Sequence, residues 1–352
     1  MLAISATDAI SPAVQRTKVF LFRPFNWGTY LKLCVVAVFT EGFSSNMNSS
    51  SGRSSHTNGS SHIDPSPFSS FHFNPLWIPA IVAMVLLTLI LIIFAAYLVT
   101  RLRFAFFHCL IHNTRQISPG WHFYRTQATR FFLMNMVVGL CYLVLVGVVA
   151  LPFIGGFWRL FHETAPGGTP PIALLLSLVL PLIPLIFLLV LLGITTDVAL
   201  RDWMMPHYAL ENATVGDAWA RVWACIRIEK RQFLAYTLLR LILPIVAMIA
   251  LFVVLIIPGL MLAGSLAAVE FGLHSAFADS TGASAVVGLL VQVFFGVLAF
   301  AFAMLAAIFL GGPLSTATRE YALIFYGSRY QALGDLLYPP LAPPETLNMP
   351  AV

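Results

Sequence analysis

Long apolar runs separated by short polar stretches dominate the pattern along this chain of 352 residues. An α-helix rises 1.5 Å per residue, so about 20 apolar residues cross a hydrocarbon core of about 30 Å. The runs predict six transmembrane helices, at 27–43, 77–99, 131–154, 171–198, 235–262 and 286–311. The first run is the weakest candidate, because it is short, carries Lys32 near its start and ends at Glu41.

The composition supports a membrane environment. Hydrophobic residues make up 59% of the chain and charged residues 9%, against about 45–50% and about 25% in soluble domains. So few charged side chains cannot cover the surface of a water-soluble protein of this length. The predicted fold class is an all-α integral membrane protein.

The distribution of basic residues predicts the orientation. Of the 19 Lys and Arg residues, 17 fall in or beside the N-terminal segment, 100–130, 199–240 or the C-terminal tail. Only Arg53 and Arg159 fall on the opposite side. Because positive charge concentrates in cytoplasmic loops, six spans with this alternation place both termini in the cytoplasm.

An internal repeat is visible at the expected cytoplasmic ends of the second, fourth and sixth runs, each of which is followed by an arginine. Trp121 follows Arg103 by 18 residues, and Trp219 follows Arg201 by 18 residues. Arg319 occupies the corresponding place in the third copy. The pattern predicts three parallel two-helix repeats, each preceded by a cytoplasmic interfacial amphipathic helix. The repeat units are 10–108, 117–207 and 214–326.

Helix-start signals support the interfacial helices. Ser11 and Ser118 each precede a proline, a combination that predicts an N-cap followed by the first helical residue. Thr214 has Asp217 three residues later, which is a variant of the capping box. A helix rich in tryptophan and arginine is expected at the headgroup boundary, where it either contacts lipid or packs on the bundle.

Two segments resemble known families. The stretch from Ala9 to Trp27 is similar to a family of uncharacterised bacterial multi-pass membrane proteins. The segment with Pro206, Glu211-Asn212, Asp217-Ala218-Trp219, Arg221, Trp223 and Phe233 resembles the related membrane domain of some bacterial glycerophosphodiester phosphodiesterases. The resemblance implies a bacterial inner-membrane location. Those enzymes carry their chemistry on a separate soluble barrel, for which the remaining segments are too short, so hydrolysis is not implied.

The sequence contains no recognisable catalytic constellation. No phosphate-binding glycine loop is present, and His108 and His112, four residues apart, lack a third metal ligand. We therefore predict a protein that is not an enzyme and holds neither a metal nor a cofactor. The basic residues are dispersed, which argues against a nucleic-acid partner.

Charged residues close to the expected bilayer are the best candidates for function, because charge is costly in hydrocarbon. Asp197, Arg201, Arg240, Glu270 and Glu320 lie there, and we expect a ring of ion pairs joining the repeats. The predicted contacts for lipid or a partner are Arg101, Arg103, Trp121, Asp197, Arg201, Glu211, Trp219, Arg221, Arg231, Arg319 and Glu320.

The sequence therefore predicts a non-enzymatic protein that organises lipid, with a preference for anionic species, or holds a partner at the cytoplasmic face. A homo-oligomer or another membrane protein is an equally open partner. The alternative is a transporter or flippase-like carrier, since Pro181, Pro184, Pro244 and Pro258 are expected to break two of the spans. Flexible segments are expected at 44–75 and 338–352.

Overall fold

The structure is a computed structural model, and it describes residues 3–42, 77–163, 172–277 and 283–338. Within these ranges the chain is helical and contains no strand. The elements are α1 Ile10–Phe22, α2 Trp27–Ala37, η1 Val38–Gly42, α4 Trp77–Ile111, α5 Ile117–Phe123, α6 Arg125–Glu163, α7 Ile172–Val198, η2 Ala199–Met204, α8 Met205–Glu211, α9 Val215–Ile228, α10 Lys230–Phe277, α11 Ala283–Gly327 and α12 Gln331–Leu337. The predicted loop 44–75 and residues 339–352 of the predicted tail lie outside the described part.

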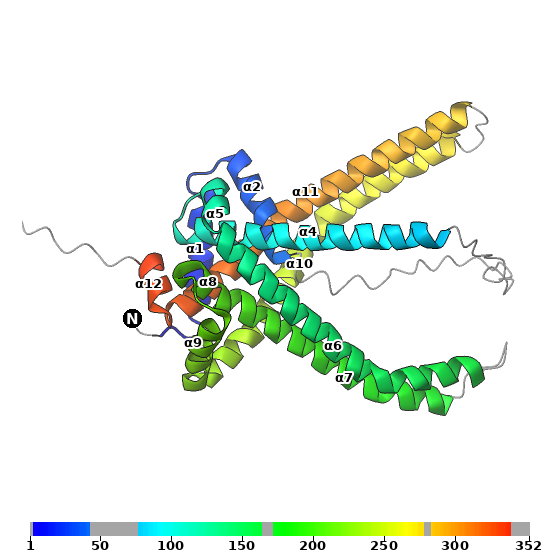
Figure 1. Cartoon of the computed structure of the whole chain (residues 1–352). Coiled ribbons are helices and arrows are strands. Elements are labelled where there is room, and N and C mark those ends of the chain that lie inside the picture. Colours follow the sequence, from blue (N-terminus) through cyan, green and yellow to red (C-terminus); the bar gives the residue numbers. More distant parts are fainter. Residues whose placement is uncertain (1–2, 43–76, 164–171, 278–282, 339–352) are drawn as a thin grey trace, which may run out of the picture.

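Figure 1 shows a compact head from which three arms diverge. The head consists of α1, α2, η1, α5, η2, α8, α9 and α12 with the adjoining ends of α4, α6, α10 and α11. The arms are α4 alone, the pair α6–α7 and the pair α10–α11. The first and last described helices, α1 and α12, both pack in the head. The head is therefore where elements distant in sequence meet.

Five described helices are long and apolar enough to cross a membrane, and they coincide with the last five predicted spans. Their ranges are Pro79–Ile111, Arg125–Gly156, Leu176–Glu211, Lys230–Ile257 and Val286–Gly327. The most hydrophobic stretch of each contains no buried residue. Such surfaces need an apolar solvent, so the chain is a multi-pass membrane protein.

The first predicted span is not among these helices. At 27–43 the chain forms α2 and η1, of 11 and 5 residues, which together are about 24 Å long and short of a bilayer core. Tyr30, Leu33 and Cys34 are buried in the head instead. Gly312 of α11 permits this close packing, because a Cβ added there would lie 2.8 Å from the Cα of Cys34.

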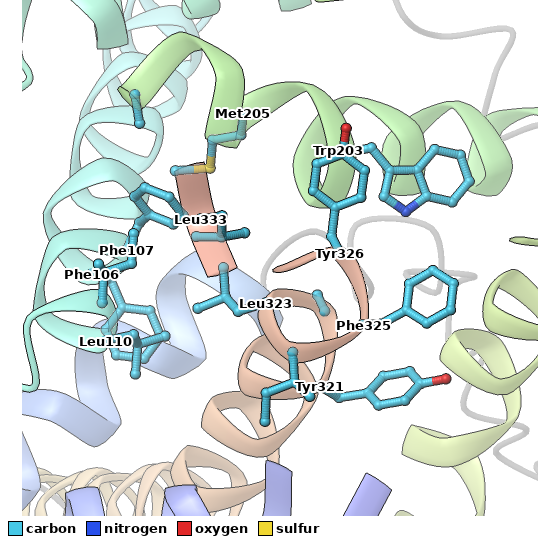
Figure 2. Packing of buried hydrophobic residues seen from close by; sticks show 14 of the residues in the cluster. Phe106, Phe107, Leu110, Trp203, Met205, Tyr321, Leu323, Phe325, Tyr326 and Leu333 are labelled. Carbon is cyan, nitrogen blue, oxygen red and sulfur yellow. The ribbon is translucent and has the colours of Figure 1, made fainter. Parts of the chain in front are cut away.

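Aromatic side chains fill the apolar core of the head. Figure 2 shows Phe106 and Phe107 of α4 on one side and Phe325 and Tyr326 of α11 on the other. All four are buried, as is Trp203 of η2. Burying a large apolar side chain contributes about 1.5–3 kcal/mol, so this core fixes the ends of the arms.

The predicted helix starts are confirmed at one of three places. Thr214 caps α9, and its hydroxyl accepts a hydrogen bond from the Asp217 amide at 3.3 Å. The predictions for Ser11 and Ser118 are wrong by two residues, since the N-cap positions are Ala9 and Gln116. Neither of these has a hydroxyl or carboxylate with which to cap, and no side-chain cap forms there.

The apolar side chains of α9 have two different surroundings. Ala218 and Val222 are buried against the head, whereas Trp219 and Trp223 are exposed and stack with ring centroids 6.0 Å apart. One face thus packs on protein and the neighbouring face leaves two indoles exposed. The threefold repeat stays a prediction.

The prolines do not break the helices that contain them. α7 runs through Pro181 and Pro184, and α10 runs through Pro244 and Pro258. A proline removes one backbone donor and bends a helix, but the flanking turns keep their hydrogen bonds within the same helix. The expected breaks are wrong.

Candidate functional site

Six charged side chains meet in the interior of the head, and we call them the ion network. They come from η1, the end of α7, η2, α10 and α11, which converge at this point. The residues are Glu41, Asp197, Arg201, Asp202, Arg240 and Arg319. All but Asp197 have side chains that are 90% buried or more.

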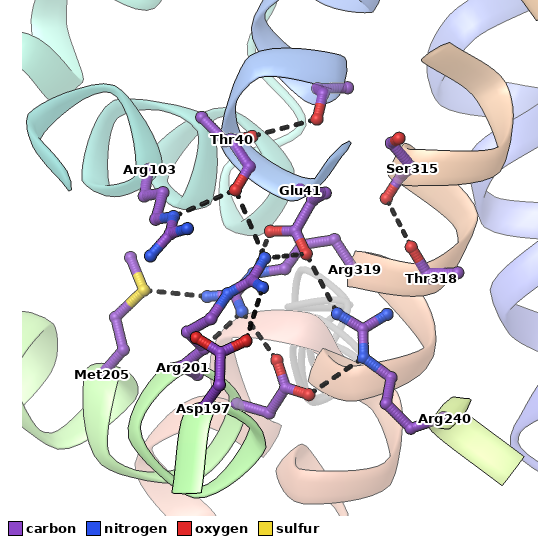
Figure 3. A network of polar contacts seen from close by, with 12 residues as sticks. Thr40, Glu41, Arg103, Asp197, Arg201, Met205, Arg240, Ser315, Thr318 and Arg319 are labelled. Atoms are coloured by element: carbon purple, nitrogen blue, oxygen red, sulfur yellow. Dashed lines mark hydrogen bonds and ion pairs between the residues drawn. The ribbon is translucent and has the colours of Figure 1, made fainter. Parts of the chain in front are cut away.

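Glu41 is the first centre of the network. Its carboxylate accepts hydrogen bonds from Arg201 at 2.6 Å and from Arg240 at 2.9 Å, and Arg319 lies 3.9 Å away. Figure 3 shows the three guanidinium groups directed at it from different helices. A carboxylate in η1 thereby ties α10, α11 and η2 together.

Asp202 is the second centre. Its two carboxylate oxygens accept hydrogen bonds from Arg319 at 3.0 Å, Arg240 at 3.1 Å and the Tyr236 hydroxyl at 2.8 Å. Arg201 also donates a hydrogen bond to Asp197, which lies 2.9 Å away and one helical turn earlier. η2 is a π-helical turn, a geometry that is frequent at functional sites. Both of its neighbouring charged residues, Arg201 and Asp202, are buried.

The charges of the network balance. Three carboxylates face three guanidinium groups, so its formal charge is zero. Glu41 lies outside the candidate spans. Burial would raise the pKa of its carboxyl, but the neighbouring arginines, Arg201 foremost, outweigh burial and lower the pKa to about 2. Glu41 therefore stays ionised at neutral pH.

The three arginines that mark the predicted repeat lie around one point. Arg103 and Arg201 both donate to the backbone carbonyl of Thr40, at 3.0 and 3.3 Å. Arg319 donates to the carbonyl of Arg201 at 3.0 Å. Arg103 and Arg201, 98 positions apart, thus meet at the Thr40 carbonyl of η1, and Arg201 and Arg319, 118 positions apart, are in direct contact.

The predicted ring of ion pairs holds in part. Asp197 and Arg201 pair as expected, but Arg319 pairs with Asp202, and Glu320 pairs instead with Arg16 of α1 at 3.2 Å. Arg319 and Glu320 are consecutive helical residues that point about 100° apart, so they reach partners on different elements. The side chain of Glu270 lies outside the described part.

Burial corrects part of the predicted contact set for lipid or a partner. Arg201, Arg319 and Glu320 are buried and engaged inside the head, so they hold helices together rather than meet a ligand at the surface. The sequence predicted ion pairs at Arg201 and Glu320 but not the burial of these side chains, because a single sequence does not distinguish a buried arginine from one that only sets the topology.

Arg103 and Asp197 lie at the ion network, whereas the other predicted residues lie outside it. Arg101 stacks 4.3 Å from the Trp121 ring centroid and donates to its carbonyl. Arg221 pairs with Glu211. Trp219 and Arg231 are exposed. Trp219 and Arg221 belong to α9, Arg231 lies at the start of α10, and Arg101 belongs to α4.

Sequence reasoning missed Glu41 and Asp202, the two centres of the network, and Tyr236. A signal was present at Glu41, since a carboxylate closes an apolar segment that is too short to span. Asp202 directly follows Arg201, and such adjacent opposite charges at the end of an apolar run also point to an internal network. Among the described residues no group of three His, Cys, Asp or Glu could hold a metal ion.

The fold and the network define a multi-pass membrane protein whose helices are anchored in one helical head. The chain belongs to the Family of unknown function (DUF7544), whose sequence profile matches residues 4–336. Neither a curated protein nor a solved structure matches it. The match covers both the head and the arms, so the two parts belong to one family unit.

Proposed function

We propose that the protein is a non-enzymatic scaffold of a bacterial inner membrane, with its head at the cytoplasmic face and its arms organising lipid. The observation that carries the proposal is the contrast in burial along the long helices. Their hydrophobic stretches have no buried residue, whereas one end of each helix packs in the head. The head fixes where the arms start, and the bilayer must fill the space around them.

Lipid is the occupant that the arms favour. Acyl chains are as apolar as leucine, so an exposed apolar helix has no strong drive to close on its neighbours in a membrane. Figure 1 shows the arms diverging away from the head. A partner helix or a second copy of the chain is the alternative occupant.

A groove at the base of one arm supports lipid contact. A cavity of about 510 Å³ lies between α2 and α11, lined by apolar residues that include Trp27, Leu31, Phe302 and Phe309. The Trp27 and Phe309 rings stack with centroids 5.8 Å apart. Aromatic side chains concentrate at membrane interfaces, and a groove of this composition fits a lipid acyl chain.

The charge distribution supports the proposed orientation. Of 19 basic residues, 17 fall in or beside the segments predicted to be cytoplasmic. The helices α1, α5, α9 and α12 lie in these segments and belong to the head. By the positive-inside rule the head faces the cytoplasm. The resemblance to the membrane domain of glycerophosphodiester phosphodiesterases agrees with this location and stays a prediction.

The saturated ion network supports a structural role over an enzymatic one. Glu41 and Asp202 are each held by at least two cationic or hydroxyl groups. A general base needs an accessible carboxylate within reach of its substrate. Carboxylates this enclosed are better suited to fixing helices.

A carrier with an aqueous path through α7 and α10 is the second candidate, and one experiment separates the two. Single cysteines replace Ile183 of α7 and Ala250 of α10 in nanodiscs, in a background where Cys141 and Cys225, the two native cysteines that are not buried, are changed to alanine. A charged, water-soluble maleimide should leave both unmodified if lipid surrounds the arms. Both positions are exposed in the structure, so burial in protein does not explain protection.

The matched control is Ala220→Cys, an exposed position on α9 of the head. It should react fully under the same conditions and show that the reagent reaches the protein. Rapid modification at Ile183 or Ala250 would contradict the scaffold and favour a carrier.

A further inference from the structure

A second site lies at the corner between α9 and α10. The chain turns there around a cavity of about 600 Å³, within the size range of small-molecule sites. Its lining includes Arg227, Lys230, Arg231 and Arg329, with Glu229 as the acidic residue. We call this cavity the basic pocket.

The charges of the basic pocket do not balance. Glu229 forms an ion pair with Arg329, whose guanidinium donates two hydrogen bonds to it at 2.7 and 3.0 Å. Arg227, Lys230 and Arg231 are exposed and make no hydrogen bond or ion pair with any residue of the described ranges. Three cations thus surround one hollow, and their mutual repulsion falls when an anion enters.

Two features give the basic pocket a fixed wall. Arg329 is held by Glu229 and lies 4.0 Å from the Phe325 ring centroid, which locks its guanidinium. Gln232 accepts a hydrogen bond from the Ala6 amide at 3.2 Å, and this tie brings the N-terminal segment against the opening. Lys230 and Arg231 begin α10, where the helix dipole adds positive potential.

The ion network provides the internal comparison. Its arginines have carboxylate partners and its formal charge is zero, whereas the basic pocket keeps an excess of three positive charges. We propose that the basic pocket binds a phosphate group, carried either by a lipid headgroup or by a soluble phosphate compound. Arginine suits this ligand, because its planar fork donates two hydrogen bonds to phosphate oxygens.

The test uses the full chain in phosphatidylcholine nanodiscs titrated with inorganic phosphate by calorimetry, and native mass spectrometry of the protein from membranes containing phosphatidylglycerol. Arg227→Gln and Arg231→Gln should each weaken binding about fivefold, as expected for one basic contact of about 1 kcal/mol. Binding should also weaken at high salt. Arg125→Gln, an exposed arginine at the start of α6, is the control and should have no effect.

The two binding measurements distinguish the source of the phosphate. Binding of inorganic phosphate identifies a soluble ligand, and retained phosphatidylglycerol without it identifies a headgroup. The proposal is overturned if neither probe binds, if both pocket variants bind like the wild type, or if Arg125→Gln loses as much. None of these outcomes depends on the arms, so the scaffold proposal is tested separately.

Discussion

The head and the arms are built from the same helices but follow different rules. In α11, Val297, Leu298 and Phe300 are more than half exposed, whereas Tyr321 and Phe325 are completely buried. The outer part is apolar except for Ser284 and Gln292, as suits a helix in lipid, whose backbone hydrogen bonds lie within the helix. The inner part carries Arg319 and Glu320, both engaged in ion pairs. One helix therefore passes from a lipid solvent into a protein interior.

The comparison shows what holds the molecule together. Lipid-facing apolar surface contributes little to the association of helices, so the arms cannot set their own arrangement. The head supplies an aromatic core and a neutral ion network at the point where the arms begin. Changes in the buried interior of the head should therefore destabilise the protein, and equivalent changes in the arms should not.

The largest effect is expected for Asp202→Asn. The substitution keeps the shape of the side chain but leaves Arg240 and Arg319 without one of their counter-charges in a buried site. Breaking a buried ion pair costs about 3–5 kcal/mol. Denaturant unfolding in detergent, followed by tryptophan fluorescence, should report a loss of this size.

The control for this change is Asp335→Asn, an exposed carboxylate on α12 of the same head. Its unfolding free energy should match the wild type. Equal effects of the two substitutions would mean that the ion network does not stabilise the head.

Replacing either of two glycines of α11 by alanine should change stability by an intermediate amount, with opposite signs at the two positions. At Gly312 an added Cβ collides with Cys34 of α2, so Gly312→Ala should destabilise by about 1–3 kcal/mol, as overpacking does. At Gly296, in the arm, nothing lies within 4 Å of an added Cβ. There alanine should stabilise the helix by about 0.5–1 kcal/mol.

Thermal unfolding of the two glycine variants side by side measures this difference. Destabilisation of both to the same degree would show that the arm at Gly296 is packed against something, and the division into head and arms would need revision.

The smallest effect is expected for Arg221→Gln at the rim of the head. Arg221 pairs with Glu211, and its own side chain is 52% exposed. Ion pairs in water contribute about 0–1 kcal/mol, so the variant should unfold within that range of the wild type. A larger loss of unfolding free energy would mean that this exposed pair stabilises the head as the buried ion network does.

The sequence predicted the arms well and the head poorly, for a physical reason. Spanning helices are recognised from length and hydropathy alone, and five of the six predicted segments coincide with candidate spans. The first predicted segment is shorter and carries two charged residues, and its Cys34 packs on Gly312; no local pattern reveals a partner 278 residues away.

The candidate site was predicted in the same uneven way. The Asp197 and Arg201 pair follows from spacing of one helical turn. The contacts of Glu41 with Arg240 and of Asp202 with Arg319 join residues 199 and 117 positions apart. Such contacts depend on how the head is assembled, which periodicity does not encode.

The most direct test of the account is cross-linking between two arms in nanodiscs. In the background without Cys141 and Cys225, a cysteine at Ile183 or Phe187 of α7 is combined with one at Met248, Ala250 or Val253 of α10. All five positions are exposed, and the variants are treated with a short thiol cross-linker. Gly156→Cys with Leu178→Cys, within the α6–α7 arm, is the positive control, since a Cβ at Gly156 would touch the Leu178 side chain. The account predicts efficient cross-linking within the arm and none between arms. Efficient cross-linking of α7 to α10 would contradict it, because the helices would then close into a bundle with no lipid between them.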